Sequence, residues 1–277
     1  MKIITISDGR GTNAVIAPDK GATVISLTRD GEEFLYCNEE NLRSPERPRC
    51  GIPFLFPIFG RLQDGRYAYE GKTYAMEIHG FGHLSRWQVL EQGSDFVRLV
   101  LEANEGTLAI YPFRFRTELC FRVGDGALSI EQRYENMDDR VMPYNFGFHP
   151  YFRAEKLEHI SVESTAETFF DFTVGKPRPL GHGMVSVTLP EGAPETGAVL
   201  MKVQSPTVLH IPEEGRRVTM EFDESFPQHV LWTQAGKEFL CVEPVNGTAN
   251  GLNTGVYLTL QPGEVKETTL RMKAERI

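Results

Sequence analysis

The chain has 277 residues, of which 40% are hydrophobic and 10% aromatic, and this composition excludes an intrinsically disordered protein. Its 29 lysines and arginines stand against 38 aspartates and glutamates, so the formal charge of −9 argues against nucleic acid or an anionic membrane as a partner. Residues 1–7 are too short for the core of a signal peptide, and no segment approaches the roughly 18 apolar residues of a membrane span. We therefore expect a cytoplasmic protein.

Four cysteines occur in the chain, and their spacing matches no common metal-binding motif. They are Cys37, Cys50, Cys120 and Cys241. A cytoplasmic setting would keep these thiols reduced. We expect four free thiols, no metal ion and no other cofactor.

A length of 277 residues is long for one domain, but all-β sandwiches and barrels of this size occur as single domains. The sequence has no internal repeat, low-complexity tract or composition change typical of a linker. The glycine- and proline-rich segment 175–197 is interpreted as a region of loops. We expect residues 1–277 to form one domain.

Apolar and polar residues alternate through most of the chain, and no segment of helical length carries an apolar stripe at helical spacing. This pattern predicts an all-β protein. Glycine, proline, aspartate and asparagine separate the alternating segments, as is typical of turns. Besides the hairpin described next, the predicted strands are 14–17, 23–28, 87–92, 96–103, 207–211, 218–222, 230–233, 239–243, 256–260 and 268–272.

The clearest alternation covers residues 113–134 and predicts a long antiparallel hairpin. Its turn is the Gly-Asp-Gly sequence at 124–126. Phe113, Phe115, Thr117, Leu119, Phe121 and Val123 are predicted to share one face of the first strand, and Leu128, Ile130, Gln132 and Tyr134 one face of the second. Strands of this length suit a large sandwich.

Candidate chemistry first appears at 51–61 (GIPFLFPIFGR) and 78–87 (IHGFGHLSRW). Arg61 ends an apolar run, where its guanidinium could donate hydrogen bonds to hydroxyl groups or pair with an acid. His79 stands before Gly80, and glycine permits close approach of the backbone to a ligand or an ordinary turn. With the neighbouring aromatic Phe81, these residues are candidates for substrate binding.

A second stretch, residues 142–152 (MPYNFGFHPYF), contains His149. Pro150 disfavours the helical conformation for the residue before it and so holds His149 extended. The surrounding aromatic residues are flat apolar surfaces of the kind that cover the C–H faces of sugar rings. The imidazole is either a group that exchanges protons near neutral pH or a buried, hydrogen-bonded histidine of an aromatic core.

A third stretch, residues 230–247 (VLWTQAGKEFLCVEPVNG), contains Trp232 and Glu243. Glu243 precedes Pro244 at the end of an apolar run. A carboxylate in this position is either a solvated strand terminus or a base held at the mouth of a cleft, and the residues alone leave both open. Trp232, an aromatic residue of this stretch, is a candidate for substrate binding.

The sequences of these stretches and their order along the chain resemble the motifs of the aldose 1-epimerase (galactose mutarotase-like) family, and the resemblance covers most of the chain. The similarity is greatest to the branch that includes the hexose-6-phosphate epimerases. The matching motifs are P-x-L-F-P-x-x-G-R at 53–61, H-G-F at 79–81, Y-P-F-x-F at 111–115, P-x-x-x-G-x-H-P-Y-F at 143–152, C-x-E-P at 241–244 and L-x-P-G-E at 260–264.

The resemblance implies a large antiparallel β-sandwich that binds a sugar on a concave sheet face. In that family, the glutamate matching Glu243 takes the proton of the anomeric hydroxyl and the histidine matching His149 protonates the ring oxygen. The residues matching His79 and Arg61 bind or orient the sugar. Such ring opening needs one base and one acid and no metal or nucleotide.

Two departures from the family patterns leave alternatives open. The aspartate of a G-x-D-H-like segment in galactose mutarotases has no match here, and His83 stands where sugar-phosphate epimerases have the arginine of H-G-F-A-R. A hexose phosphate would then need replacement arginines, and the candidates are Arg43, Arg47, Arg49, Arg66 and Arg86. A catalytically silent carbohydrate-binding protein is the alternative from another class. A glycosidase, which needs two carboxylates about the scissile bond, fits the motifs least.

Overall fold

The computed structural model describes residues 1–43 and 48–277, and strands dominate it. The α-helices in this part of the chain are short: α1 (Glu39–Arg43), α2 (Glu105–Ile110) and α3 (Gly251–Thr254). Single 3-10 turns occur at Pro18–Lys20, Gln63–Gly65, Leu157–His159, Gly181–Gly183 and Pro212–Glu214. The prediction of an all-β protein is confirmed, and none of the described helices is long and apolar enough to span a membrane.

One nine-stranded antiparallel sheet has the order β18-β15-β20-β21-β25-β11-β10-β9-β8. Its strands are β8 (Gln88–Gln92), β9 (Phe96–Glu102), β10 (Phe115–Gly124), β11 (Ala127–Asn136), β15 (Ser161–Glu163), β18 (Met184–Val185), β20 (Thr207–Ile211), β21 (Arg216–Phe222) and β25 (Val265–Arg276). The predicted hairpin is confirmed as β10 and β11, and the residues assigned to its core faces, from Phe115 to Tyr134, are buried.

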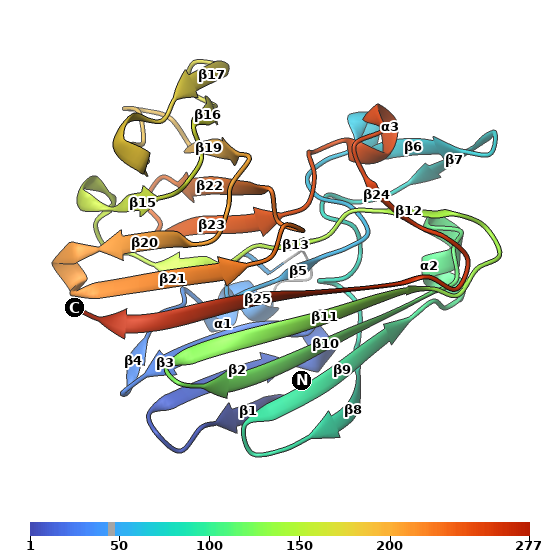
Figure 1. Ribbon diagram of the computed structural model, residues 1–277, viewed down its shortest axis with the longest axis horizontal. Helices are drawn as coiled ribbons and strands as arrows, with labels where there is room; N and C mark the ends of the chain where they lie inside the picture. The colour runs from blue at the N-terminus through green and yellow to red at the C-terminus, as the bar shows by residue number, and fades with distance from the viewer. Residues whose placement is uncertain (44–47) are drawn as a thin grey trace.

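A second, eight-stranded sheet has the order β17-β16-β19-β22-β23-β13-β5, with β14 also paired to β23. Its strands are β5 (Phe54–Leu55), β13 (Gly147–Phe148), β14 (Tyr151–Arg153), β16 (Thr168–Asp171), β17 (Lys176–Pro179), β19 (Glu195–Met201), β22 (Gln228–Gln234) and β23 (Phe239–Val245). In the view of Figure 1, β16 and β17 lie at the upper left, above β22 and β23.

Three smaller sheets complete the structure. The four-stranded one holds β1 (Ile4–Ser7), β2 (Thr12–Ala17), β3 (Thr23–Arg29) and β4 (Glu32–Glu33). The two-stranded ones pair β6 (Arg66–Tyr69) with β7 (Lys72–Ala75) and β12 (Met142–Tyr144) with β24 (Leu258–Leu260). The strand predicted at 256–260 therefore exists, but it lies outside both large sheets.

The two large sheets pack face to face, as the sandwich prediction requires. One buried cluster contains Leu231, Leu240 and Val242 from the eight-stranded sheet together with Leu128 and Ile130 from the other. Aromatic rings meet across the interface: the ring centroid of Phe54, in β5, lies 6.3 Å from that of Tyr134, in β11. The central strands of the eight-stranded sheet therefore have one face in the core and leave the opposite face open.

Some strands have no alternating signal in the sequence. β19 contains Thr196, Gly197 and Ala198, which are all buried, so its sequence does not alternate between apolar and polar residues. The segment predicted as loops, 175–197, contains β17, β18 and the first residues of β19 among its turns. Strands from this segment therefore extend both large sheets where the sequence indicates loops.

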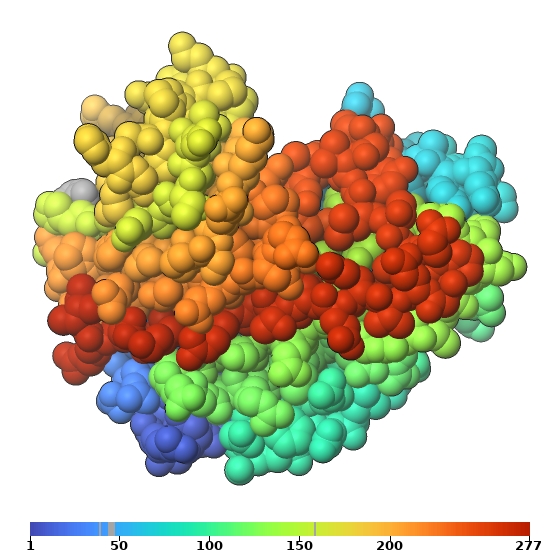
Figure 2. All heavy atoms as spheres, in the orientation of Figure 1, coloured from blue at the N-terminus to red at the C-terminus, as the bar shows by residue number. Residues whose placement is uncertain are grey.

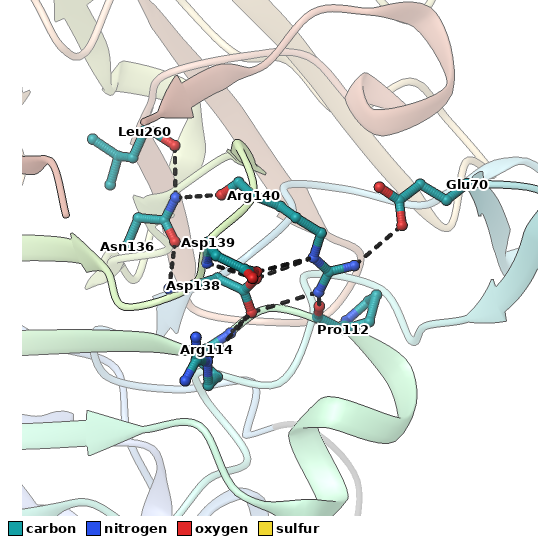
Figure 3. A network of polar contacts seen from close by, with 8 residues as sticks. All are labelled: Glu70, Pro112, Arg114, Asn136, Asp138, Asp139, Arg140 and Leu260. Carbon is teal, nitrogen blue, oxygen red and sulfur yellow. Dashed lines mark hydrogen bonds and ion pairs between the residues drawn. The ribbon is translucent and has the colours of Figure 1, made fainter. Parts of the chain in front are cut away.

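A polar network ties the turn after β11 to neighbouring segments (Figure 3). Asp138 accepts hydrogen bonds from Arg140 Nε at 3.0 Å and from the Arg114 amide at 3.0 Å. Arg140 also donates to the Pro112 carbonyl and to Glu70. Asn136 donates to the carbonyl of Leu260 at 2.8 Å. These bonds connect β11 with the β6–β7 hairpin and β24.

Candidate active site

Strand register brings His149 and Glu243 together. Gly147 pairs with Val245, and Tyr151 pairs with Cys241. His149 lies midway between the first members of these pairs and Glu243 midway between the second, so the two side chains are cross-strand neighbours. His149 Nε2 lies 3.4 Å from Glu243 Oε1, and both side chains are buried. The two predicted catalytic residues therefore meet, although they come from distant parts of the sequence.

The pleat of β22 and β23 separates core residues from residues of the open face. Leu231, Leu240 and Val242 point into the space between the two large sheets. Trp232 and Cys241 belong to a different cluster on the opposite face. Glu243 follows Cys241 by two residues and shares its side of the strand. The alternation thus decides that the carboxylate faces outward from the core.

Aromatic packing and a backbone bond hold the His149 ring in place. Its ring is parallel to that of Tyr151, with centroids 4.6 Å apart, and its amide donates to the Pro53 carbonyl at 3.0 Å. The Trp232 ring stands edge-on to it at 5.8 Å. The glycine two residues earlier is required by close packing, because a Cβ on Gly147 would lie 2.6 Å from Val245 Cγ1.

His79 approaches the same place from a tight turn. Its φ of 65° and that of Gly80, 72°, are both in the left-handed region. The Gly60 amide donates to His79 Nδ1 at 3.1 Å, so the proton of the neutral ring resides on Nε2. The His79 and His149 ring centroids are 5.4 Å apart. His79 is thus arranged as a hydrogen-bond donor rather than as a base.

These groups line a pocket of about 260 Å³. Its walls are formed by Arg49, Phe59, Arg61, Ile78, His79, His149, Phe172, Glu195, Val230, Trp232 and Glu243. Figure 2 shows that the molecular surface is hollowed between the part that carries β16 and β17 and the part that carries α3, β6 and β7. Five of the six predicted site residues, Arg61, His79, His149, Trp232 and Glu243, are among the lining residues.

Phe81, the sixth predicted site residue, belongs to the core instead. Its ring packs against Phe56, Tyr111 and Phe115, with centroids 5.7 to 6.1 Å apart. The Phe81 amide donates to the Phe56 carbonyl at 2.9 Å, which fixes the segment beside β5. Phe59, from the segment 51–61, lines the pocket where Phe81 was expected. Its ring centroid lies 5.7 Å from that of His79.

The candidate phosphate-binding arginines are dispersed. Arg49 lines the pocket and donates to Gln234 Oε1 at 3.2 Å. Arg86 lies 3.6 Å from Asp19, and neither it nor Arg43 or Arg66 is among the lining residues described. Arg47 lies outside the described residues. The cations of the described pocket are therefore Arg49 and Arg61.

Two lining residues, Phe172 and Glu195, had not been singled out from the sequence. Phe172 follows β16 and Glu195 begins β19, and both side chains are exposed. Glu195 lies in the segment interpreted as loops, 175–197, and Phe172 lies just before that segment. No local pattern there indicates that a side chain will face a ligand. The pairing of β19 with β22 places Glu195, and the pairing of β16 with β19 places Phe172.

Comparison with known proteins identifies the family of this chain. The family model of the aldose 1-epimerases matches residues 2–273. The chain belongs to the aldose 1-epimerase family. Family membership supports a carbohydrate epimerase activity, and the expected galactose mutarotase-like fold is confirmed by solved structures.

Relatives of this aldose 1-epimerase family member span nearly its whole length. The Slr1438 protein of Synechocystis sp. PCC 6803 is 28% identical, with a TM-score of 0.92 over 100% of this chain and 96% of that chain. A galactose mutarotase-like protein of Lactobacillus casei is 22% identical, with a TM-score of 0.84 over 99% of this chain and 100% of that chain. A Cenchrus ciliaris protein provisionally named glucose-6-phosphate 1-epimerase is 26% identical over 88% of this chain and 76% of its own length.

Proposed function

We propose that this protein is a cytoplasmic aldose 1-epimerase, a mutarotase that interconverts the α and β anomers of a hexose. The observation that carries this proposal is the separation of 3.4 Å between His149 Nε2 and Glu243 Oε1 in a pocket shared with His79, Arg61 and Trp232. The anomeric hydroxyl oxygen and the ring oxygen of a hexose are bonded to one carbon. A carboxylate and an imidazole this close can therefore act on both oxygens together.

In the proposed reaction, Glu243 takes the proton of the anomeric hydroxyl while protonated His149 donates a proton to the ring oxygen. The C1–O bond of the ring breaks and leaves an open aldehyde, neutral His149 and protonated Glu243. Rotation about C1–C2 exposes the other face of the aldehyde, and the reverse transfers close the ring as the other anomer. The charges of the pair before and after each turnover are the same.

The other pocket residues fit positioning roles. His79 donates from Nε2, because its Nδ1 already accepts from Gly60. Trp232 and Phe59 present apolar rings to the C–H faces of the sugar. Arg61 and Glu195, both exposed at the pocket, offer a donor and an acceptor to hydroxyl groups.

A second candidate substrate is a hexose 6-phosphate. Arg49 and Arg61 line the pocket together, and an arginine fork binds phosphate oxygens well. The relative from Cenchrus ciliaris carries a name of that activity. The carboxylate of Glu195 at the same pocket would repel the phosphate group of such a substrate, so the free hexose remains our first choice.

Saturation-transfer NMR of anomer exchange distinguishes these substrates. We expect the wild-type protein to accelerate exchange of free glucose or galactose, and Arg49→Ala to leave that rate within about threefold. If a 6-phosphate is the true substrate, its exchange will be faster, and Arg49→Ala together with Arg61→Ala will abolish the preference. A silent binding protein would shift sugar resonances without accelerating exchange of any aldose.

A further inference from the structure

Beside the proposed acid and base lies a third group that the epimerase reaction does not use. One donor atom each of His149, Cys241 and Glu243 lies within 4.8 Å of the others, and all three residues are buried. Cys241 and Glu243 share one face of β23, and the register with β13 and β14 adds His149 from across the sheet. No local sequence spacing marks this cluster, because strand pairing alone assembles it.

The donor set matches the preferences of Zn²⁺. Imidazole nitrogen, thiolate sulfur and carboxylate oxygen are its usual protein ligands, at about 2.1, 2.3 and 2.1 Å. In a tetrahedral site with these bond lengths, the nitrogen and oxygen ligands are about 3.4 Å apart. His149 Nε2 and Glu243 Oε1 already have this separation, 3.4 Å. The sulfur must approach them by up to about 1.2 Å, because the donor atoms lie within 4.8 Å of one another and a tetrahedral edge to sulfur is about 3.6 Å.

Access and charge also suit a dication. His149 and Glu243 line the pocket, which gives a metal ion a path to the buried Cys241. Binding releases the thiol proton of Cys241 and the proton of the His149 imidazolium to the buffer, and the thiolate and the carboxylate then neutralise the two positive charges of the ion. His79 is unsuited as a fourth ligand, because its Nδ1 accepts from Gly60 and its Nε2 therefore carries the proton. The fourth position would face the pocket and hold water.

We propose that His149, Cys241 and Glu243 form a three-ligand site for Zn²⁺ whose occupation inhibits the protein. A bound ion takes the lone pair of the imidazole and the charge of the carboxylate, so neither group can transfer a proton to or from a sugar. The inhibitory half of this inference rests on the proposed function. The binding half rests only on the geometry.

Cobalt(II) is the probe for binding, because a thiolate bound to it gives a charge-transfer absorption that oxygen and nitrogen ligands do not. Titration of chelator-treated wild-type protein with Co²⁺ should produce this band with a stoichiometry of one, and Zn²⁺ should remove it. Cys241→Ser should lose the band. Cys120→Ser, which alters another buried thiol, and Cys37→Ser with Cys50→Ser, which removes a pair whose sulfurs are 2.9 Å apart, should keep it.

Anomer exchange measured with added Zn²⁺ tests inhibition. Chelator should restore the wild-type rate, and Cys241→Ser should require at least about tenfold more Zn²⁺ for the same loss. Absence of the charge-transfer band in wild type, or its loss only in the Cys37 and Cys50 variant, would overturn the site. A protein that shows the band but never catalyses exchange would refute the proposed function and retain the metal site.

Discussion

At the scale of single residues, His149 and Arg61 have different proposed roles, one in proton transfer and one in sugar binding. His149 is buried beside Glu243, whereas Arg61 is exposed at the pocket. A group that gives its proton in the transition state affects kcat, and a group that holds hydroxyls throughout affects KM. The burial of each side chain thus agrees with a different kinetic role.

We expect His149→Asn to lower kcat by on the order of 10²–10⁴ with little change in KM. Arg61→Ala should raise KM and leave kcat nearly unchanged. Both constants are obtained by polarimetry over a range of sugar concentrations. Equal effects of the two variants on kcat would contradict the assignment.

A second histidine, His229, lies on the core side of β22. Neither ring nitrogen has a hydrogen-bond partner among the described residues, and the ring packs 4.6 Å from that of Phe222. Burial lowers the pKa of His229 to about 3. The folded protein therefore holds this imidazole neutral under conditions where an unfolded chain would protonate it.

His229 should make the protein less stable in mild acid. Its folded pKa of about 3 lies below the unfolded value of about 6.5, so the unfolded state binds the extra proton between these values. Lowering the pH from 7 to 5 should cost the folded state about 2 kcal/mol through this residue. Urea denaturation of wild type and His229→Leu at both pH values measures this difference. An identical pH dependence in the two proteins would show that His229 is not held neutral.

At the scale of elements, the polar network around Asp138 holds β11, the β6–β7 hairpin and β24 in a fixed arrangement (Figure 3). Burial tends to raise the pKa of Asp138, but hydrogen bonds from Arg140 and from the Arg114 and Asp139 amides outweigh it and hold that pKa well below its ordinary value. The carboxylate form is therefore the one that stabilises the fold.

Asp138→Asn should lower the free energy of unfolding by about 1–2 kcal/mol at pH 7, because it removes charge-assisted hydrogen bonds. The folded pKa is depressed, so this stabilisation is fully present above the unfolded value of about 3.9 and is lost progressively as the pH falls from that value through the folded pKa. Asp139→Asn is the matched control, since the Asp139 side chain is 87% exposed and that of Asp138 7%. Equal losses in the two variants at pH 7 would refute the role of the network.

At the scale of the whole molecule, the sequence predicts what depends on local alternation. The β10–β11 hairpin, whose side chains alternate over both strands, is predicted at 113–134, and each outer end of the observed hairpin lies two residues later in the sequence. β19 was not predicted, because its buried threonine, glycine and alanine carry no alternating pattern. The eight-stranded sheet continues beyond β22 because β19 pairs with it, and this pairing joins segments that are distant in the sequence.

In the pocket too, some residues could be predicted from local sequence and others are placed by contacts between distant segments. His149 and Glu243 stand in motifs with proline after each, and these were identified from the sequence. The choice between Phe59 and Phe81 depends on the bridge between Phe56 and Gly80, which turns Phe81 into the core. Glu195 reaches the pocket through strand pairing alone. A contact between two segments that are distant in the chain produces no periodic pattern of apolar residues in either segment, so the sequence does not predict it.

The central claim is that Glu243 is the base of an anomer-exchanging enzyme, and polarimetry of freshly dissolved α-glucose and α-galactose tests it most directly. The wild-type protein should accelerate mutarotation of at least one of these sugars above the buffer rate. Glu243→Gln keeps the shape of the side chain and should lower that rate by on the order of 10²–10⁴ while sugar binding survives. Near-normal turnover in Glu243→Gln, or no catalysis by the wild-type protein, would contradict the account.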